Sequence, residues 1–117
     1  MKFYWAVIIK KDWVGTGDWD DFAYDDYAVH CLLSEKGDII FLNDNMHMAG
    51  IEMIFSGFLD GVSYALGEKI TPKKILLAVD DDLYADEAIK EAFAKWRKEN
   101  ELVGDETIND FLKRVLE

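Results

Sequence analysis

Cysteine, histidine and proline are scarce in this sequence. Cys31 is the one cysteine, and His30 and His47 are the two histidines. A lone cysteine cannot form an internal disulfide, and these three residues cannot supply the ligand spacings of a zinc finger. Proteins without disulfides are typical of reducing compartments. We therefore expect a cytoplasmic protein that needs no cofactor.

Long apolar runs are also missing. The longest candidate, 46–66, is interrupted by Glu52, Asp60 and three glycines, whereas a membrane helix needs roughly 18 apolar residues. The apolar run 3–9 near the start is short, and no small-residue cleavage site follows it. We expect neither a membrane span nor a signal peptide.

Basic residues are scarce over the first part of the chain. The 117 residues include 24 acidic and 13 basic residues, for a net charge of −11. Lys36 is the only base between Asp12 and Glu68. A negative field repels phosphate and attracts basic surfaces. We therefore do not expect this chain to bind nucleic acid directly. We expect it to bind a basic protein partner.

Apolar residues make up 50% of the sequence, which is enough for one core. Apolar runs predict four strands, at 3–11, 27–34, 38–42 and 74–79. Helical spacing predicts three helices, over 46–66, from Asp82 and from Gly104. We predict a single acidic α+β domain over 1–117, in which helices pack on a mixed four-stranded sheet.

The segment 17–27 has the most unusual composition, with five carboxylates and four aromatic residues but no base. We expect an irregular loop over 13–26. Aromatic residues are frequent anchors of interfaces, so a partner-binding surface is predicted at Asp18, Trp19, Asp20, Asp21, Phe22, Tyr24, Asp25 and Asp26. The alternative is a solvated loop whose aromatic residues pack on the sheet. The calcium-hand pattern fails here, because Ala23 stands where its glycine belongs.

The predicted function is a non-enzymatic, acidic binding or inhibitor protein that occludes a basic protein partner. The partner would be a nuclease or another nucleic-acid-binding enzyme, and the carboxylates would take the place of phosphates. In charge and size the chain is similar to phage anti-defence proteins and to the immunity proteins of nuclease toxins.

An enzyme is the alternative. Acidic residues follow the first and fourth strands and lie in the first and last helices, at Asp12, Asp80, Glu52 and Asp110. This layout resembles that of ribonuclease H-like nucleases, and the order of the elements over about 3–98 is also similar to theirs. The resemblance implies a magnesium-dependent phosphodiester hydrolase whose carboxylates hold two metal ions.

Other features allow two interpretations each. Asp80, Asp81 and Asp82 could form a site, or Asp82 could cap the following helix. Gly50, Gly57 and Gly61 form a small-residue stripe that indicates close approach either to the sheet or to a second copy in a homodimer.

His30 and Cys31 are adjacent on a strand, so their side chains are expected on opposite faces. They cannot form a Cys-His nucleophilic pair with each other. Cys31 is predicted to pack in the core with Val29 and Leu33, and His47 to be exposed or to cap the helix.

Overall fold

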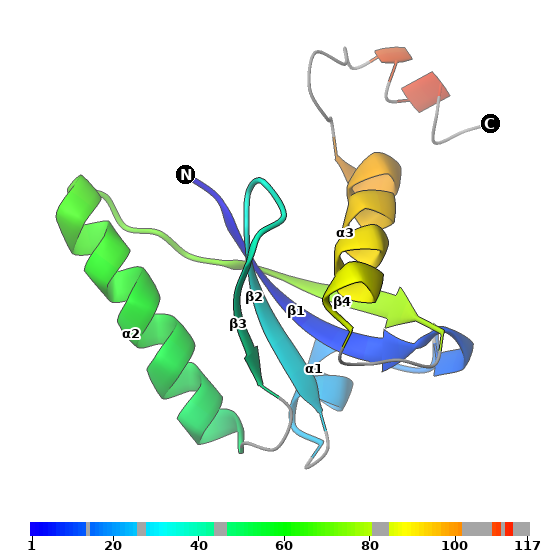
Figure 1. Ribbon diagram of the computed structural model, residues 1–117, viewed down its shortest axis with the longest axis horizontal. Coiled ribbons are helices and arrows are strands. Elements are labelled where there is room, and N and C mark those ends of the chain that lie inside the picture. Colours follow the sequence, from blue (N-terminus) through cyan, green and yellow to red (C-terminus); the bar gives the residue numbers. More distant parts are fainter. Residues whose placement is uncertain are drawn as a thin grey trace.

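The computed structural model describes residues 1–13, 15–25, 28–43, 47–80 and 85–101, together with 109, 110, 112 and 113. Its elements are β1 (Phe3–Lys10), the 3₁₀ helix η1 (Lys11–Trp13), α1 (Trp19–Ala23), β2 (Val29–Ser34), β3 (Ile39–Asn43), α2 (Met48–Leu66), β4 (Lys73–Val79) and α3 (Asp86–Asn100) (Figure 1). The predicted strands and first two long helices are present. The predicted helix from Gly104 lies almost entirely outside the described residues.

The four strands form one mixed sheet in the order β3-β2-β1-β4. β1 is antiparallel to β2 and parallel to β4, and β2 is antiparallel to β3. Two parallel strands need a long crossover, and α2 provides it between β3 and β4. The predicted α+β fold with a mixed four-stranded sheet is confirmed.

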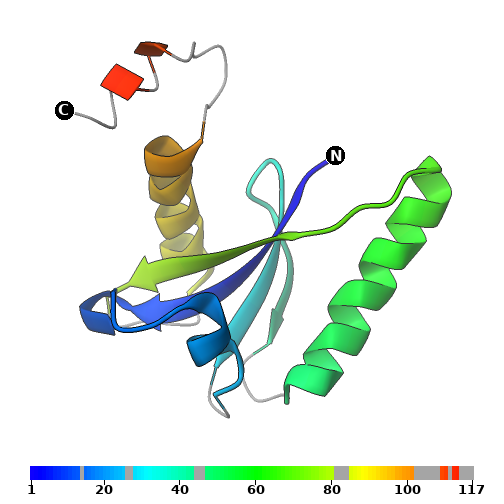
Figure 2. The same ribbon diagram turned by 180° about the vertical axis from the view of Figure 1, so that it is seen from behind.

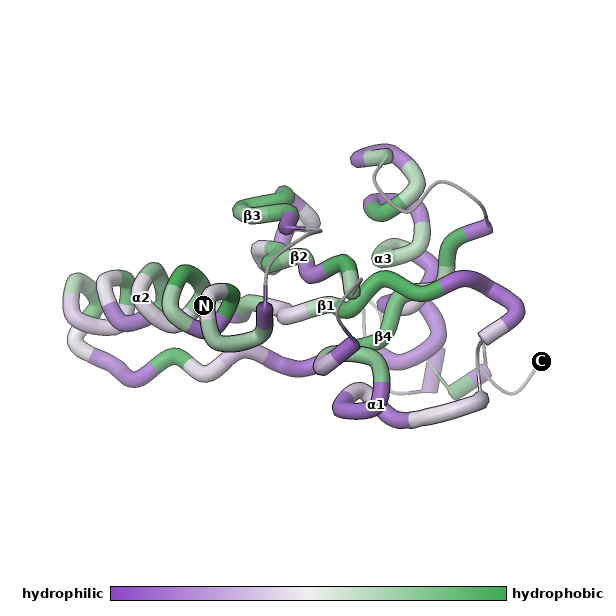
Figure 3. The backbone as a smooth tube through the Cα atoms, turned by 90° about the horizontal axis from the view of Figure 1, so that it is seen from below, coloured by the Kyte–Doolittle hydropathy of each residue, from purple (hydrophilic) through white to green (hydrophobic). Residues whose placement is uncertain are grey.

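Both faces of the sheet are covered, which explains the uninterrupted apolar sequence of β1. One face packs against Ile89 and Phe93 of α3. The other face packs against Ile51, Phe55 and Leu59 of α2 and, beside them, against α1. Figures 2 and 3 show α2 and α3 on opposite sides of the sheet. No helix among the described residues has the length and apolar character needed to span a bilayer.

Cys31 is fully buried in the cluster that also contains Val29 and Leu33, as predicted. Burial raises the pKa of its thiol to about 12. A thiol with so high a pKa is not a nucleophile at neutral pH. His30 lies on the opposite face and is also buried.

The expectation of an irregular loop over 13–26 is wrong. This segment contains the end of η1 and the helix α1. The N–H of Asp18 donates a hydrogen bond to the Asp21 carboxylate over 2.8 Å, which is one half of a capping box. Gly17 makes room for this contact, because a Cβ atom there would lie 2.8 Å from the Asp21 carboxylate.

The long helices begin at slightly different positions from those expected. α2 begins at Met48, and the exposed His47 occupies its N-cap position. The helix was expected from residue 46, which lies outside the described residues. Ala85 is the N-cap of α3, and Asp82, the predicted cap, lies outside the described residues.

Two glycines of the stripe on α2, Gly57 and Gly61, do not approach the sheet closely. A Cβ atom added at Gly57 or Gly61 would meet no atom within 4 Å. The interpretation that the stripe packs closely on the sheet is therefore wrong for these two glycines. The homodimer interpretation of the stripe stays a prediction.

Candidate partner-binding surface

The five-residue helix α1 is held in place by its tryptophan. A helix of this length is not stable by itself in water. The Trp19 indole N–H donates to the carbonyl oxygen of Trp5 over 3.2 Å, and the two rings meet edge to face. The Lys74 ammonium lies 4.7 Å from the centre of the Trp19 ring. α1 therefore derives its stability from β1 and β4.

A buried histidine fixes the other end of α1. The Trp5 indole N–H donates to Nδ1 of His30 over 2.9 Å, and Nε2 of His30 lies 3.0 Å from the carbonyl oxygen of Ala23. Because an indole N–H only donates, Nδ1 must accept, so Nε2 carries the proton and donates to Ala23. Burial lowers the pKa of His30. A neutral histidine thus connects α1 to β1 and β2.

α1 and the segments that flank it also carry exposed acidic and aromatic side chains, whereas Phe22 of α1 is half-buried against Val7, Ile9 and Ala23. Trp13 and Phe22 stack with ring centres 6.4 Å apart and planes within 8° of parallel. Trp13 is 46% exposed and Tyr24 is 63% exposed. Asp12, Asp20 and Asp25, which neighbour these residues in the sequence or in α1, are exposed. We name these six residues, Asp12, Trp13, Asp20, Phe22, Tyr24 and Asp25, the acidic-aromatic surface.

The predicted partner-binding residues thus fall into groups with different roles. Asp20, Phe22, Tyr24 and Asp25 belong to the acidic-aromatic surface. Trp19 is half-buried and holds α1 on the sheet, while Asp18 and Asp21 are exposed but interact at the start of α1. Asp26 lies outside the described residues.

Trp13 was not predicted as part of this surface. It reaches Phe22 because the chain turns at Gly15, whose φ of 88° lies in the left-handed region that favours glycine. The glycines at 15 and 17 signal a turn. They do not show which aromatic residues the turn brings together.

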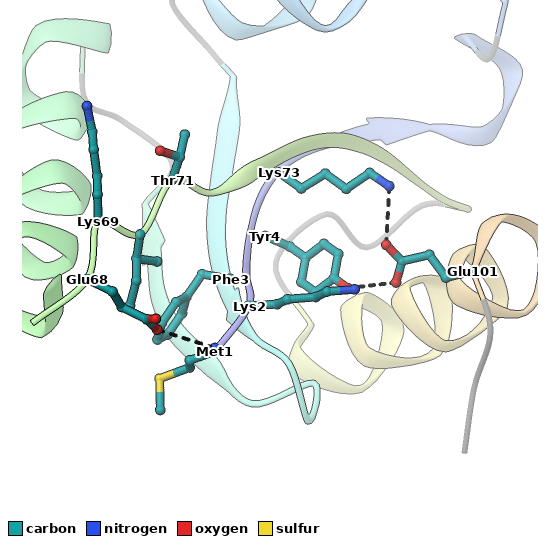
Figure 4. A pocket seen from close by; sticks show the side chains of 10 residues that line it. Met1, Lys2, Phe3, Tyr4, Glu68, Lys69, Thr71, Lys73 and Glu101 are labelled. Carbon is teal, nitrogen blue, oxygen red and sulfur yellow. Dashed lines mark hydrogen bonds and ion pairs between the residues drawn. The ribbon is translucent and has the colours of Figure 1, made fainter. Parts of the chain in front are cut away.

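A second group of charged side chains lies around a polar pocket of about 470 Å³ beside the start of β1 (Figure 4). The Tyr4 hydroxyl donates to Glu101 over 2.6 Å, and Lys73 donates to the other carboxylate oxygen over 3.2 Å. Burial would raise the pKa of Glu101, but the hydrogen bonds from Tyr4 and Lys73 and the charges of Lys73 and Lys2 lower it. Burial, followed by the contact with Glu101, raises the pKa of Tyr4. These groups join the end of α3 to the sheet.

The acidic residues of the hydrolase alternative are not brought together. Asp12 and Asp80 follow the neighbouring parallel strands β1 and β4. The Asp80 carboxylate pairs with the Lys11 ammonium, with Oδ1 and Nζ 3.9 Å apart. α2, which carries Glu52, lies at the other end of the sheet from η1 (Figures 1 and 2). Within the part of the chain that the structure describes, Asp110 included, no three His, Cys, Asp or Glu side chains are placed to hold a metal ion.

No family model, curated protein or solved structure matches this chain. The resemblance to ribonuclease H-like nucleases therefore remains one of element order and of single acidic residues. The acidic-aromatic surface is the feature on which a function can be argued.

Proposed function

We propose that this chain is a cytoplasmic, acidic binding protein that occludes the basic surface of a nucleic-acid-handling protein, in the manner of anti-defence or nuclease-immunity proteins. The observation that carries the proposal is the acidic-aromatic surface, held on the sheet by Trp19 and His30. It combines exposed carboxylates with the exposed rings of Trp13 and Tyr24 on α1 and the segments that flank it.

The anchoring supports a binding role because a surface that is already ordered loses little conformational entropy when it binds. Trp13, Phe22 and Tyr24 would supply contact area, as aromatic residues do at the centres of interfaces. The carboxylates would pair with Lys or Arg side chains that otherwise contact phosphates.

The charge of the chain supports the same proposal. Aromatic rings in this region already attract cations within the chain. Lys10 lies over the Trp13 ring of the acidic-aromatic surface, and Lys74 lies over the Trp19 ring, which holds α1 on the sheet. A net charge of −11 would speed the encounter with a basic partner, and this acceleration falls with ionic strength. Binding is therefore expected to be strongly salt-dependent.

The test compares two double variants that remove the same charge. Asp12→Asn with Asp20→Asn changes the acidic-aromatic surface and leaves the Asp18–Asp21 contact intact. Glu52→Gln with Asp60→Asn changes exposed carboxylates on α2. Immobilised wild type should capture a basic nucleic-acid-handling protein from a lysate of the cells that make it, and high salt should release that protein.

Asp12 and Asp20 would each form one charge pair with the partner, worth up to about 1 kcal/mol. Losing both pairs corresponds to a loss of roughly thirtyfold in affinity. We expect this loss for Asp12→Asn with Asp20→Asn and little change for the α2 variant. Equal capture by both variants, or capture that salt does not affect, would contradict the proposal. Thermal melting of both variants checks that they are folded.

A further inference from the structure

A groove of about 810 Å³ runs between β4 and α3. Every residue from Leu76 to Asp80 lines it. Successive side chains of a strand point to opposite faces of the sheet, so a groove that touches five consecutive residues follows the edge of the strand. β4 is the last strand in the sheet order, and no other described strand pairs with its outer edge.

The helix α3 forms the opposite wall of this groove with a continuous stripe of its surface. The stripe consists of Ala88, Glu91, Ala92, Lys95, Trp96 and Glu99. These positions follow the i, i+3, i+4 spacing of one helical face. Ile89 and Phe93 pack on the sheet, and Ala88, Ala92 and Trp96 of the stripe pack against the same core cluster. One broad face of α3 therefore contacts the core and also lines the groove.

The shape of the groove suits an extended peptide. The free edge of a strand offers a row of N–H and C=O groups that pair with another strand. A helix already satisfies its own backbone groups and cannot pair with such an edge. The small side chains of Ala88 and Ala92 leave space beside the edge, and the half-buried Trp96 supplies an apolar contact. At about 3.3 Å per residue, the five lining residues 76–80, of which four belong to β4, match a peptide segment of similar length, about 16 Å.

The charges of the wall indicate which peptide would bind. Glu91, Lys95 and Glu99 follow one another at intervals of four residues, and all three are exposed. Lys95 can offset only one of the two glutamates between which it lies. Lys11 and Asp80 also line the groove, and they offset each other because Lys11 Nζ lies 3.9 Å from Asp80 Oδ1. The lining therefore carries one net negative charge, which favours a Lys or Arg side chain on the peptide.

We propose that the groove between β4 and α3 binds an extended segment of a partner protein by strand addition to β4, with apolar side chains against Ala92 and Trp96 and a Lys or Arg beside Glu91 or Glu99. Strand addition of this kind obtains affinity from main-chain hydrogen bonds and specificity from alternate side chains. The site is separate from the acidic-aromatic surface, although its end at Lys11 and Gly15 lies next to it.

The test uses a phage-displayed library of random dodecapeptides, selected on the wild-type protein. We expect enriched peptides to alternate apolar residues with others and to carry Lys or Arg. A synthetic peptide made from the enriched sequence should slow hydrogen exchange of β4 amides. Enrichment of no sequence, enrichment of a helical i, i+3, i+4 pattern, or protection away from β4 would overturn the proposal.

Matched variants locate the peptide. Ala92→Trp fills the groove and should weaken the peptide at least about tenfold. Ala94→Trp places the same side chain on the exposed side of α3, outside the groove, and should leave the affinity unchanged. Glu91→Lys with Glu99→Lys should shift the enriched sequences toward Asp and Glu. Equal binding by the two tryptophan variants would refute the assignment.

A further variant separates this site from the proposed function. Asp20→Asn should bind the selected peptide as wild type does, since Asp20 lies on α1 and not in the groove. A loss of peptide binding in Asp20→Asn would mean that the peptide occupies the acidic-aromatic surface, which would overturn the groove assignment and leave the proposed function standing.

Discussion

The buried histidine makes the stability of this protein sensitive to acid. In the folded state His30 is 1% exposed, accepts a hydrogen bond from Trp5 at Nδ1 and donates one to Ala23 from Nε2. If Nδ1 were protonated, its N–H would face the Trp5 indole N–H, so two donors would meet without an acceptor. The proton would also place a positive charge in the core. Burial, which disfavours the charged form, lowers the pKa of His30, although the hydrogen bond to the Ala23 carbonyl oxygen acts in the opposite direction.

The sign of the effect follows from proton uptake. In the unfolded chain the histidine has its ordinary pKa of about 6.5. Because folding lowers this pKa, the unfolded state binds more protons below pH 6.5, and acid therefore favours unfolding. The free energy of unfolding is expected to fall by up to about 1.4 kcal/mol for each pH unit below 6.5, until the folded-state pKa is reached.

Urea unfolding at several pH values between 7.5 and 5.5 measures this loss. His30→Gln is the informative comparison, because a glutamine can accept from Trp5 and donate to Ala23 but does not titrate. The difference between wild type and His30→Gln also cancels the contributions of the groups that both proteins share. We expect wild type to lose stability toward pH 5.5 and His30→Gln to lose much less.

Parallel pH dependence of the two proteins would refute the reasoning. His30→Ala provides a second measurement at neutral pH, where it leaves the Trp5 N–H and the Ala23 carbonyl oxygen unpaired. Each unpaired buried group costs about 1–3 kcal/mol, and the cavity adds to this cost. A loss below about 1 kcal/mol would mean that His30 does not hold α1 on the sheet.

Two more predictions concern stability. Gly57→Ala and Gly61→Ala should each raise the free energy of unfolding by about 0.5–1 kcal/mol, because alanine favours the helix and its Cβ meets no neighbour; urea unfolding of dilute protein measures this, and a loss of stability would show that the two positions are packed. Tyr4→Phe should cost about 1.5–3 kcal/mol at pH 7, because it removes a hydrogen bond to the ionised Glu101. Since the pKa of Glu101 is lowered in the folded state, that cost should shrink as pH falls through this pKa and the carboxylate is protonated. A Tyr4→Phe cost that stays constant from pH 7 into acid would contradict this account.

Much of the candidate site could not be predicted from local patterns. Trp19 was predicted to anchor a partner because it lies among carboxylates, yet it packs on Trp5, which is fourteen positions earlier in the chain. α1 has five residues, too few to show a helical period in the sequence. Its existence depends on contacts with β1, β2 and β4 that no local window contains.

The sequence by itself determined the order and type of the long elements. The uninterrupted apolar run of β1 follows from burial on both faces, and the helical period of α2 ends at Gly67, whose φ of 71° is the left-handed conformation that stops a helix. These are local properties of a backbone and its side-chain spacing. The acidic composition, with one base between Asp12 and Glu68, is equally a property of the sequence.

Only the tertiary structure decided which side chains come together at the surface. The stacking of Trp13 on Phe22, the connection of α1 to β2 through His30, and the groove between β4 and α3 each join residues of different structural elements. Such contacts depend on how the sheet orders its strands and on which face each helix covers. That choice depends on the packing of the whole core, and periodicity along the chain does not record it.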